Sequence, residues 1–226
     1  MPIKQEVAQA LTDNWEIGLF ETPCKAPGQF CYGCCCCCGI CMAAQQRLEI
    51  LDVIQEPYVC CGGLCPCGPL GQPQDRNCVY AEVCCCLGHA VAGNRFLMQT
   101  RFNLMNTPCD DCILWTVCLA SWLTCIMQMV GCDLGDDLAN CVDMMVLIVN
   151  GCMLAQHQTQ LEAIKRNGGY QGPPQHVLGM MDPFQQQVMM QGKPQQQQMG
   201  GHPQVVQGQV VGQPYHPGGQ PQQPGW

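Results

Sequence analysis

The longest apolar run of the chain lies in its second half. From Ile113 to Gly131 the sequence carries no charged residue. Six side chains recur there at steps of three and four, at Trp115, Cys118, Trp122, Cys125, Met129 and Cys132. This spacing places all six on one stripe of an α-helix. A second apolar segment follows an acidic break, so we predict an apolar helical hairpin with helices at about residues 112–132 and 138–156.

Two interpretations of this hairpin remain open. At ~1.5 Å per residue the first helix is long enough to span the ~30 Å hydrocarbon core of a bilayer. Asp143 lies near the middle of the second helix, and a charge there costs about 2.5–3.5 kcal/mol in lipid. The hairpin therefore either packs inside a small soluble domain or makes one or two membrane passes. In the second case Lys165 and Arg166 favour a cytoplasmic side for the end of the second helix.

The first half of the chain predicts helices separated by cysteine-rich loops. Residues 1–23 read as a polar lead with a short helix over Lys4–Leu11. Good helix-forming sequence covers residues 42–55 and ends before Pro57, and a further helical stretch covers residues 77–103. The expected fold is mainly α, small and cysteine-rich, with short helices packed around cysteine-rich loops and the apolar hairpin near the C-terminus.

Composition divides the chain at about residue 167. Residues 24–167 form the predicted cysteine-rich domain. Residues 168–226 contain no cysteine and hold 17 Gln, 12 Gly and 9 Pro. A segment of this composition buries too little apolar surface to offset its backbone entropy. We therefore predict a disordered Gln/Gly/Pro-rich tail over 168–226.

Cysteine is unusually abundant in this chain, so the reactions and ligands of thiols decide which functions it could have. All 23 cysteines lie between Cys24 and Cys152, and the N-terminus does not read as a secretory signal. We therefore expect a reducing compartment, in which a disulfide framework is the less favoured use of the thiols. The net charge of −8 argues against a general nucleic-acid binder. Metal ligation, lipid attachment and burial as small hydrophobes remain.

Two cysteine motifs have the spacing of metal ligands. One is Cys-Cys-x3-Cys-Pro-Cys at 60–67, where Gly and Pro shape a loop, and the other is Cys-Asp-Asp-Cys at 109–112. Zinc takes four thiolate or imidazole ligands, commonly paired on short turns. We predict that zinc or a similar soft divalent metal is bound by Cys60, Cys61, Cys65, Cys67, Cys109 and Cys112.

A run of adjacent thiols cannot serve a single ion, because a zinc site takes four ligands. The run comprises Cys34, Cys35, Cys36, Cys37 and Cys38. These residues are candidates for S-acylation, which would attach the domain to a membrane, with burial or metal binding as the alternatives. For cysteines inside helices, such as Cys118 and Cys125, we expect burial as small hydrophobes.

No residue pattern indicates catalysis. The sequence has no Gly-rich phosphate loop, no Ser/His/Asp signature and no His-Glu-x2-His motif. Three of the five histidines, His176, His202 and His216, lie in the predicted tail. We expect a protein without enzymatic activity.

The order of motifs resembles the placenta-specific-eight cysteine-rich family, which includes cornifelin, plant cadmium-resistance proteins and plant cell-number regulators. The resemblance covers about residues 14–132. It rests on Trp15-x2-Gly-Leu-Phe, the cysteine run, the Cys-Pro-Cys at 65–67, and Arg101-Phe-Asn-Leu followed by Cys109-Asp-Asp-Cys. It implies a small membrane-associated protein with no known catalysis, and in parts of the family divalent-metal handling or control of growth.

Two hypotheses of function follow. The first is a non-enzymatic, membrane-associated protein that binds zinc, located at the plasma membrane with a cytoplasmic tail. The second is a structural or scaffold component of a larger cytoplasmic assembly, in which cysteines form the core and the tail contacts partners. Expected partners are a membrane or membrane proteins, with a homo-oligomer or larger assembly as a further option and no nucleic acid.

Overall fold

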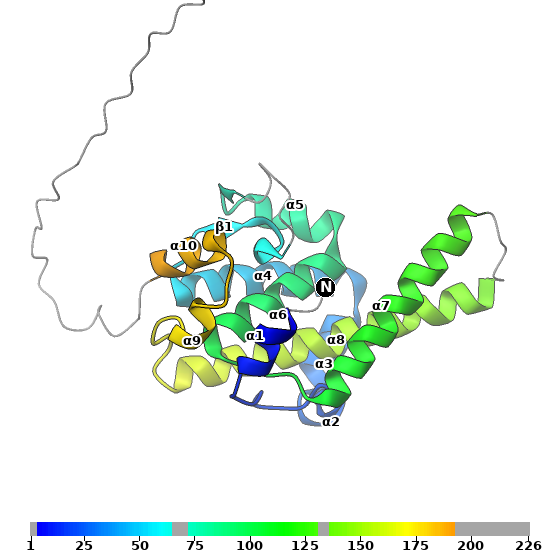
Figure 1. Ribbon diagram of the computed structural model, residues 1–226. Coiled ribbons are helices and arrows are strands. Elements are labelled where there is room, and N and C mark those ends of the chain that lie inside the picture. The colour runs from blue at the N-terminus through cyan, green and yellow to red at the C-terminus, as the bar shows by residue number, and fades with distance from the viewer. Residues whose placement is uncertain (1–3, 65–71, 131–135, 193–226) are drawn as a thin grey trace, which may run out of the picture.

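The computed structural model shows a helical body from which a helical hairpin projects (Figure 1). It describes residues 4–64, 72–130 and 136–192. Within these ranges the chain is mainly helical, which confirms the predicted fold class. The strands are β1 (Tyr58–Val59) and β2 (Pro73–Gln74), an antiparallel pair with Tyr58 opposite Gln74.

The helices are listed here in chain order. They are α1 (Gln5–Ala10), the 3-10 turn η1 (Leu19–Glu21), α2 (Thr22–Lys25), α3 (Pro27–Cys34), α4 (Cys36–Ile54), the 3-10 turn η2 (Cys60–Gly63), α5 (Cys78–Cys85), α6 (Leu87–Phe102), α7 (Pro108–Met129), α8 (Asp136–Arg166), α9 (Gln175–Leu178) and α10 (Pro183–Gln191).

Local sequence explains where the central helices begin and end. The helix predicted over 42–55 begins earlier, at Cys36, and ends where Gln55 adopts a left-handed conformation (φ 56°) before Pro57. The stretch predicted over 77–103 is divided between α5 and α6 at Cys86, which leaves helical geometry (φ −144°, ψ 57°). Asn103 ends α6 in the left-handed region (φ 60°).

The core of the body lies between α4, α6 and the second half of α8. Small residues such as Ala43, Ala44 and Ala90 are fully buried there and let the helices approach closely. Larger apolar side chains fill the remaining space, among them Ile50, Leu51, Ile54, Met98, Leu154 and Leu161. Burial of each such side chain contributes roughly 1.5–3 kcal/mol.

Two of the buried ion pairs lie across this core. Arg101 on α6 donates to both oxygens of Glu56, at 2.9–3.1 Å, and both side chains are almost fully buried. Arg47 on α4 donates to Glu82 on α5 at 3.1 Å and is equally buried. Removal of one partner from such a pair leaves an uncompensated charge and costs about 3–5 kcal/mol. The pairs therefore specify how α4, α5 and α6 are arranged.

The predicted tail differs from the structure at residues 168–192. This segment contains α9 and α10, and it packs on the body through Val177, Val188 and Met189, which are buried. The helix α10 begins at Pro183, and the Asp182 side chain caps it by accepting from the Gln185 backbone N–H. The remaining part of the predicted tail, 193–226, lies outside the described residues.

Both hairpin helices extend further than predicted at the polar ends that adjoin the body. The first begins at Pro108 rather than 112, because Thr107 and Asp110 exchange hydrogen bonds between side chain and backbone and cap it. The second continues past 156 to Arg166, because Leu161 and Ala163 bury an apolar face in a segment that is otherwise polar. Val130 lies just beyond the end of α7, and residues 131–132 of the predicted first helix lie outside the described residues.

Truncation tests whether 168–192 belongs to the body. A chain ending at Gly192 should retain the free energy of unfolding of the full chain within about 1 kcal/mol, since it keeps α9 and α10. A chain ending at Asn167 should lose at least ~3 kcal/mol, because it removes several buried apolar side chains worth ~1.5–3 kcal/mol each. Denaturant titration measures both, and equal stability of the two truncated chains would contradict the packing described.

Candidate metal centre and apolar hairpin

A left-handed turn carries the first predicted ligand motif. Cys61, Gly62 and Gly63 in η2 have φ angles of 52°, 63° and 75°. This conformation is ordinary for glycine and strained for cysteine. A Cβ added at Gly62 would lie 2.9 Å from the Gly93 carbonyl oxygen, and one at Gly93 would lie 2.8 Å from the Cys61 carbonyl oxygen. Glycine at both positions therefore lets the loop lie directly on α6.

Glu82 holds this turn from α5. Its Oε2 accepts the Cys61 backbone N–H at 2.8 Å and the Tyr58 hydroxyl at 2.6 Å. Its Oε1 accepts from Arg47 at 3.1 Å. Burial, and then the hydrogen bond to Glu82, raise the pKa of Tyr58, so this residue stays a neutral donor. The carboxylate thus fixes the orientation of Cys60 and Cys61.

The side chains of Cys60, Cys61 and Glu82 converge. Their ligand atoms all lie within 4.8 Å of one another, and the two sulfur atoms are 3.9 Å apart. Two thiolates bound to one zinc ion at ~2.3 Å with tetrahedral geometry lie about 3.8 Å apart. The sulfur spacing therefore fits a shared ion without rearrangement.

The charges of Cys60, Cys61 and Glu82 and the free acceptor site of the Glu82 carboxylate also suit a divalent ion. A carboxylate offers about four acceptor sites, and the three donors described leave one on Oε1. Two ligating thiolates and Glu82 carry three negative charges, of which Arg47 offsets one. The remaining charge of two matches a dication.

The structure brings together only part of the predicted ligand set. Cys60 and Cys61 are adjacent at the candidate centre, whereas Cys109 and Cys112 are exposed on the first turn of α7 and join no three-donor cluster in the described ranges. Cys65 and Cys67 lie outside the described residues, so their role stays a prediction.

Sequence reasoning missed Glu82. The signal was available, because Glu82 is the only Asp, Glu, Lys or Arg between Arg76 and Arg95. A single carboxylate in an otherwise apolar helix is rarely buried unless a partner offsets its charge. Its partner, Arg47, is likewise the single charge in the first part of α4.

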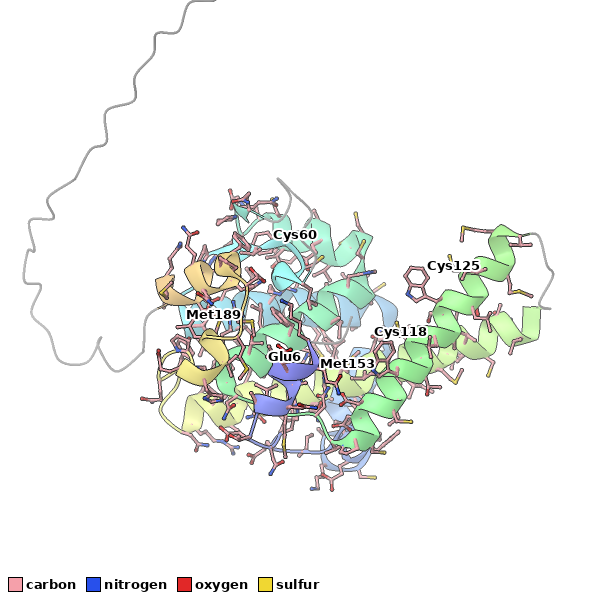
Figure 2. The ribbon with its side chains drawn as sticks, in the orientation of Figure 1. Glu6, Cys60, Cys118, Cys125, Met153 and Met189 are labelled. Carbon is pink, nitrogen blue, oxygen red and sulfur yellow. The ribbon has the colours of Figure 1, made fainter. Side chains whose placement is uncertain are left out.

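The apolar hairpin is exposed rather than packed into the body. Each of α7 and α8 is long and apolar enough to cross a membrane. One face of α7, which includes Val117, Ser121 and Thr124, is half-buried where the helix packs on α8. The other face is exposed, with Trp122 63% and Met129 74% exposed. Figure 2 shows α7, with Cys118 and Cys125 labelled, extending away from the body that carries Cys60 and Met153. Of the two interpretations, burial inside a soluble domain is therefore wrong for α7.

Most described cysteines are not core residues. Cys118 is half-buried and Cys125 is exposed, so the expectation that both are buried was wrong. Among the described cysteines Cys152 alone is buried, and the core consists of aliphatic and aromatic side chains. In the part of the chain that the structure describes, the cysteines therefore do not form the core.

The cysteine run lies at a bend between α3 and α4. Cys34 ends α3 and is half-buried, while Cys35 and Cys37 are exposed and Cys38 is half-buried. Burial, then the neighbouring Cys152 and Cys31, raise the pKa of Cys34. The run therefore contains thiols of different accessibility, and the bend itself positions them. The side chain of Cys36 lies outside the description.

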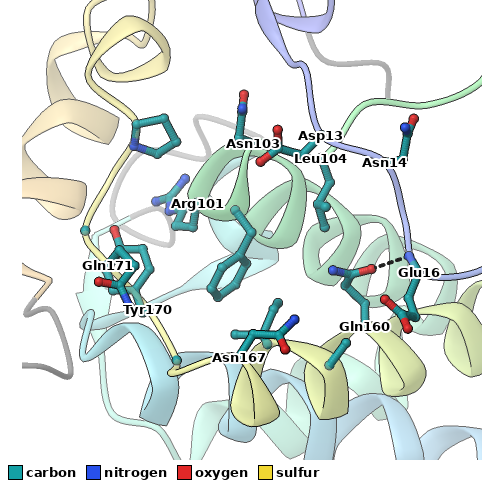
Figure 3. Close-up of a pocket in the computed structure, with 16 residues that line it drawn as sticks. Asp13, Asn14, Glu16, Arg101, Asn103, Leu104, Gln160, Asn167, Tyr170 and Gln171 are labelled. Atoms are coloured by element: carbon teal, nitrogen blue, oxygen red, sulfur yellow. Dashed lines mark hydrogen bonds between the residues drawn. The ribbon is translucent and has the colours of Figure 1, made fainter.

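An open groove of about 520 Å³ lies between the end of α6, the end of α8 and the segment that follows α8 (Figure 3). Its walls include Asp13, Arg101 and Tyr170, and Gln160 accepts the Glu16 backbone N–H at 2.6 Å. Arg101 is already paired with Glu56. Its described lining residues therefore include no unpaired cation that could bind an anionic ligand.

Comparison of the chain with protein-family models, with curated proteins and with solved structures gives no match. The resemblance to the placenta-specific-eight family therefore stays a prediction from the motifs.

A buried polar cluster lies where the hairpin meets the body. The ring of His157 stacks on Trp15 at 5.7 Å between centroids, and the Arg95 guanidinium lies 4.6 Å from the Trp15 ring. Neither ring nitrogen of His157 has a hydrogen-bond partner among the described residues. Burial, and then Arg95, hold the pKa of His157 well below its ordinary value.

This depressed pKa predicts a loss of stability in acid. Below about pH 6.5, His157 binds a proton in the unfolded chain but stays neutral in the folded chain. The free energy of unfolding therefore falls by up to ~1.4 kcal/mol for each unit by which the pH is lowered. His157→Phe keeps the stacking and has no such proton, so its unfolding free energy should change less between pH 7 and pH 5. Denaturant titrations at each pH measure this, with exposed His89→Gln as control. Parallel pH profiles of wild type and His157→Phe would contradict the assignment.

Proposed function

We propose that this chain is a membrane-anchored, cysteine-rich protein. The α7–α8 hairpin inserts into a lipid bilayer, and the helical body binds zinc or a similar soft divalent metal through Cys60 and Cys61. The observation that carries the proposal is that α7 exposes a wide apolar face along its length, while almost none of the helix is buried.

A bilayer fits the surroundings of α7 better than a second protein chain does. The helix α8 already covers one face of α7, and a second helix would cover one more stripe. The rest of an uncharged helix surface still requires an apolar environment. The 18 residues from Ile113 to Val130 carry no charge, and at ~1.5 Å each they reach about 27 Å, close to the ~30 Å of the hydrocarbon core.

Asp143 does not outweigh this gain. Its charge is exposed on α8 and costs about 2.5–3.5 kcal/mol at the centre of a bilayer. The exposed side chains of Leu119, Trp122, Leu123 and Met129 gain roughly 1.5–3 kcal/mol each on leaving water. The sum of these gains exceeds the penalty.

The distribution of charged residues along the chain supports one orientation of the hairpin in the membrane. No Lys or Arg occurs between Phe102 and Ile164. Asp133 lies in the connection between the hairpin helices, and Asp136 and Asp137 are the first residues of α8. Basic residues favour the cytoplasmic side of a membrane. We therefore place the body, which carries the basic residues, on the cytoplasmic side.

For the metal, the supporting observation is the convergence of two thiols and one carboxylate at a strained turn. Strained backbone conformations persist where surrounding structure enforces them and cluster at functional sites. Thiolate donors select soft or borderline ions such as zinc, whereas calcium and magnesium prefer all-oxygen sites. The metal serves here to hold the turn on α5 and α6.

Charges placed on α7 test the membrane anchor. Wild type should remain in the pellet after carbonate extraction of membranes. Leu119→Glu/Leu123→Glu should move to the supernatant, because each charge near the bilayer centre costs a few kcal/mol. Gln45→Glu/Gln187→Glu adds the same charge at exposed positions of the body and should stay in the pellet. Wild type found in the supernatant, or a Leu119/Leu123 variant as resistant as wild type, would refute the anchor.

Elemental analysis tests the metal centre. Protein purified under reducing conditions should carry one zinc per chain, and Cys60→Ser/Cys61→Ser should carry at least tenfold less. Since structural zinc contributes on the order of 10 kcal/mol, a chelator should lower the Tm of wild type and leave that of the variant unchanged.

The matched control is Cys84→Ser/Cys85→Ser, which removes two adjacent thiols that are exposed on α5. This variant should retain zinc and its Tm. Metal-free wild type, or equal zinc loss in both double variants, would contradict the assignment to Cys60 and Cys61.

A further inference from the structure

The helix α8 leaves the body at a defined level. Its side chains from Asn150 to His157 are buried. One turn earlier, Met144, Met145 and Ile148 are exposed. If the hairpin enters a bilayer, as the proposed function requires, the boundary between water and lipid lies near Val149.

The bend between α3 and α4 is attached to α8 at this same level. A Cβ added at Gly33 would lie 3.2 Å from the Gly151 Cα atom, and one at Gly151 would lie 2.3 Å from the Cys34 sulfur. The Cys34 sulfur also lies 4.0 Å from the Leu147 carbonyl oxygen. The glycines permit this close contact, which places the bend beside the point where α8 enters lipid.

The bend presents several thiols outward at that level. Cys31, Cys35 and Cys37 are exposed, whereas Cys34 is held against α8. Tyr32, beside them, is 46% exposed, and tyrosine is enriched at membrane interfaces. No three described thiols of the bend have sulfur atoms within 4.8 Å of one another, as a metal cluster would require.

We propose that Cys31, Cys35 and Cys37 form a site of S-acylation by long-chain fatty acyl thioesters at the membrane interface. The cysteine thiolate attacks the carbonyl carbon of an acyl-coenzyme A, a new thioester forms, and coenzyme A leaves as the thiolate, which takes up the proton that the cysteine lost. No oxidant or reductant takes part.

Reactivity and anchoring energetics support the same site. The backbone N–H of Cys38, and then its thiol, stabilise the Cys35 thiolate and lower the pKa of Cys35, which raises the population of the nucleophile. One acyl chain gives only marginal membrane binding, whereas a second anchoring signal makes attachment stable. Acyl chains at the bend would supply that second signal next to the hairpin.

Acyl exchange on full-length protein expressed in eukaryotic cells tests the proposal. Free thiols are blocked, thioesters are cleaved with hydroxylamine, and the released thiols are tagged with a polyethylene glycol maleimide that shifts the mass once per acyl chain. Wild type should show two or three shifts. Cys31→Ser/Cys35→Ser/Cys37→Ser should show none, and Cys84→Ser/Cys85→Ser/Cys86→Ser, which removes three exposed thiols elsewhere, should keep the wild-type pattern.

The outcomes separate this proposal from the hairpin. If wild type resists carbonate extraction but shows no hydroxylamine-dependent shift, the acylation proposal is overturned and the membrane hairpin is unaffected. Wild type that carries the shifts but is released by carbonate overturns the hairpin alone. Loss of the shifts in the Cys84–Cys86 variant instead of the bend variant overturns the site. If the triple bend variant does not accumulate, the single Cys31→Ser, Cys35→Ser and Cys37→Ser variants should each lose one shift, and a full pattern in all three overturns the proposal.

Discussion

One continuous helix, α8, connects the packed core of the body with the exposed apolar hairpin, and the rest of the structure depends on that connection. Its second half is a central element of the core, where Leu154, Ala155 and His157 are fully buried. Its first half exposes Met144, Met145 and Ile148 to the surroundings. Because a helix transmits position rigidly over its length, the packing of the body determines where the hairpin projects and how α3 and the cysteine bend lie relative to it.

Buried charges organise the body around this helix. Arg101 with Glu56 and Arg47 with Glu82 are paired in the interior, and loss of a single partner from such a pair costs several kcal/mol. The second pair also reaches the turn at Cys61 through the Glu82 carboxylate. The candidate metal centre is thus continuous with the core, which makes its geometry a property of the fold rather than of a loose loop.

Regular hydrophobic spacing made the long helices predictable. The hairpin follows from apolar periodicity, and most of α4 follows from helix-forming residues that end before Pro57. Cys60 and Cys61 follow from their motif. Glu82 did not, because its partner Arg47 is 35 residues away and only the fold brings them together. The average composition of 168–226 concealed α10, although Asp182-Pro183 is a local start signal. The exposure of Cys125 depends on which face of α7 packs on α8, and the helical spacing alone does not reveal this.

The central claim is that α7 lies in lipid, and depth-dependent quenching of tryptophan fluorescence tests it directly. The Trp122 component is obtained as the difference between wild type and Trp122→Phe in lipid vesicles. The account predicts that lipids brominated deep in the acyl chain quench this component and that iodide in the water does not. Quenching of Trp122 by iodide to the same extent with and without vesicles would contradict the account.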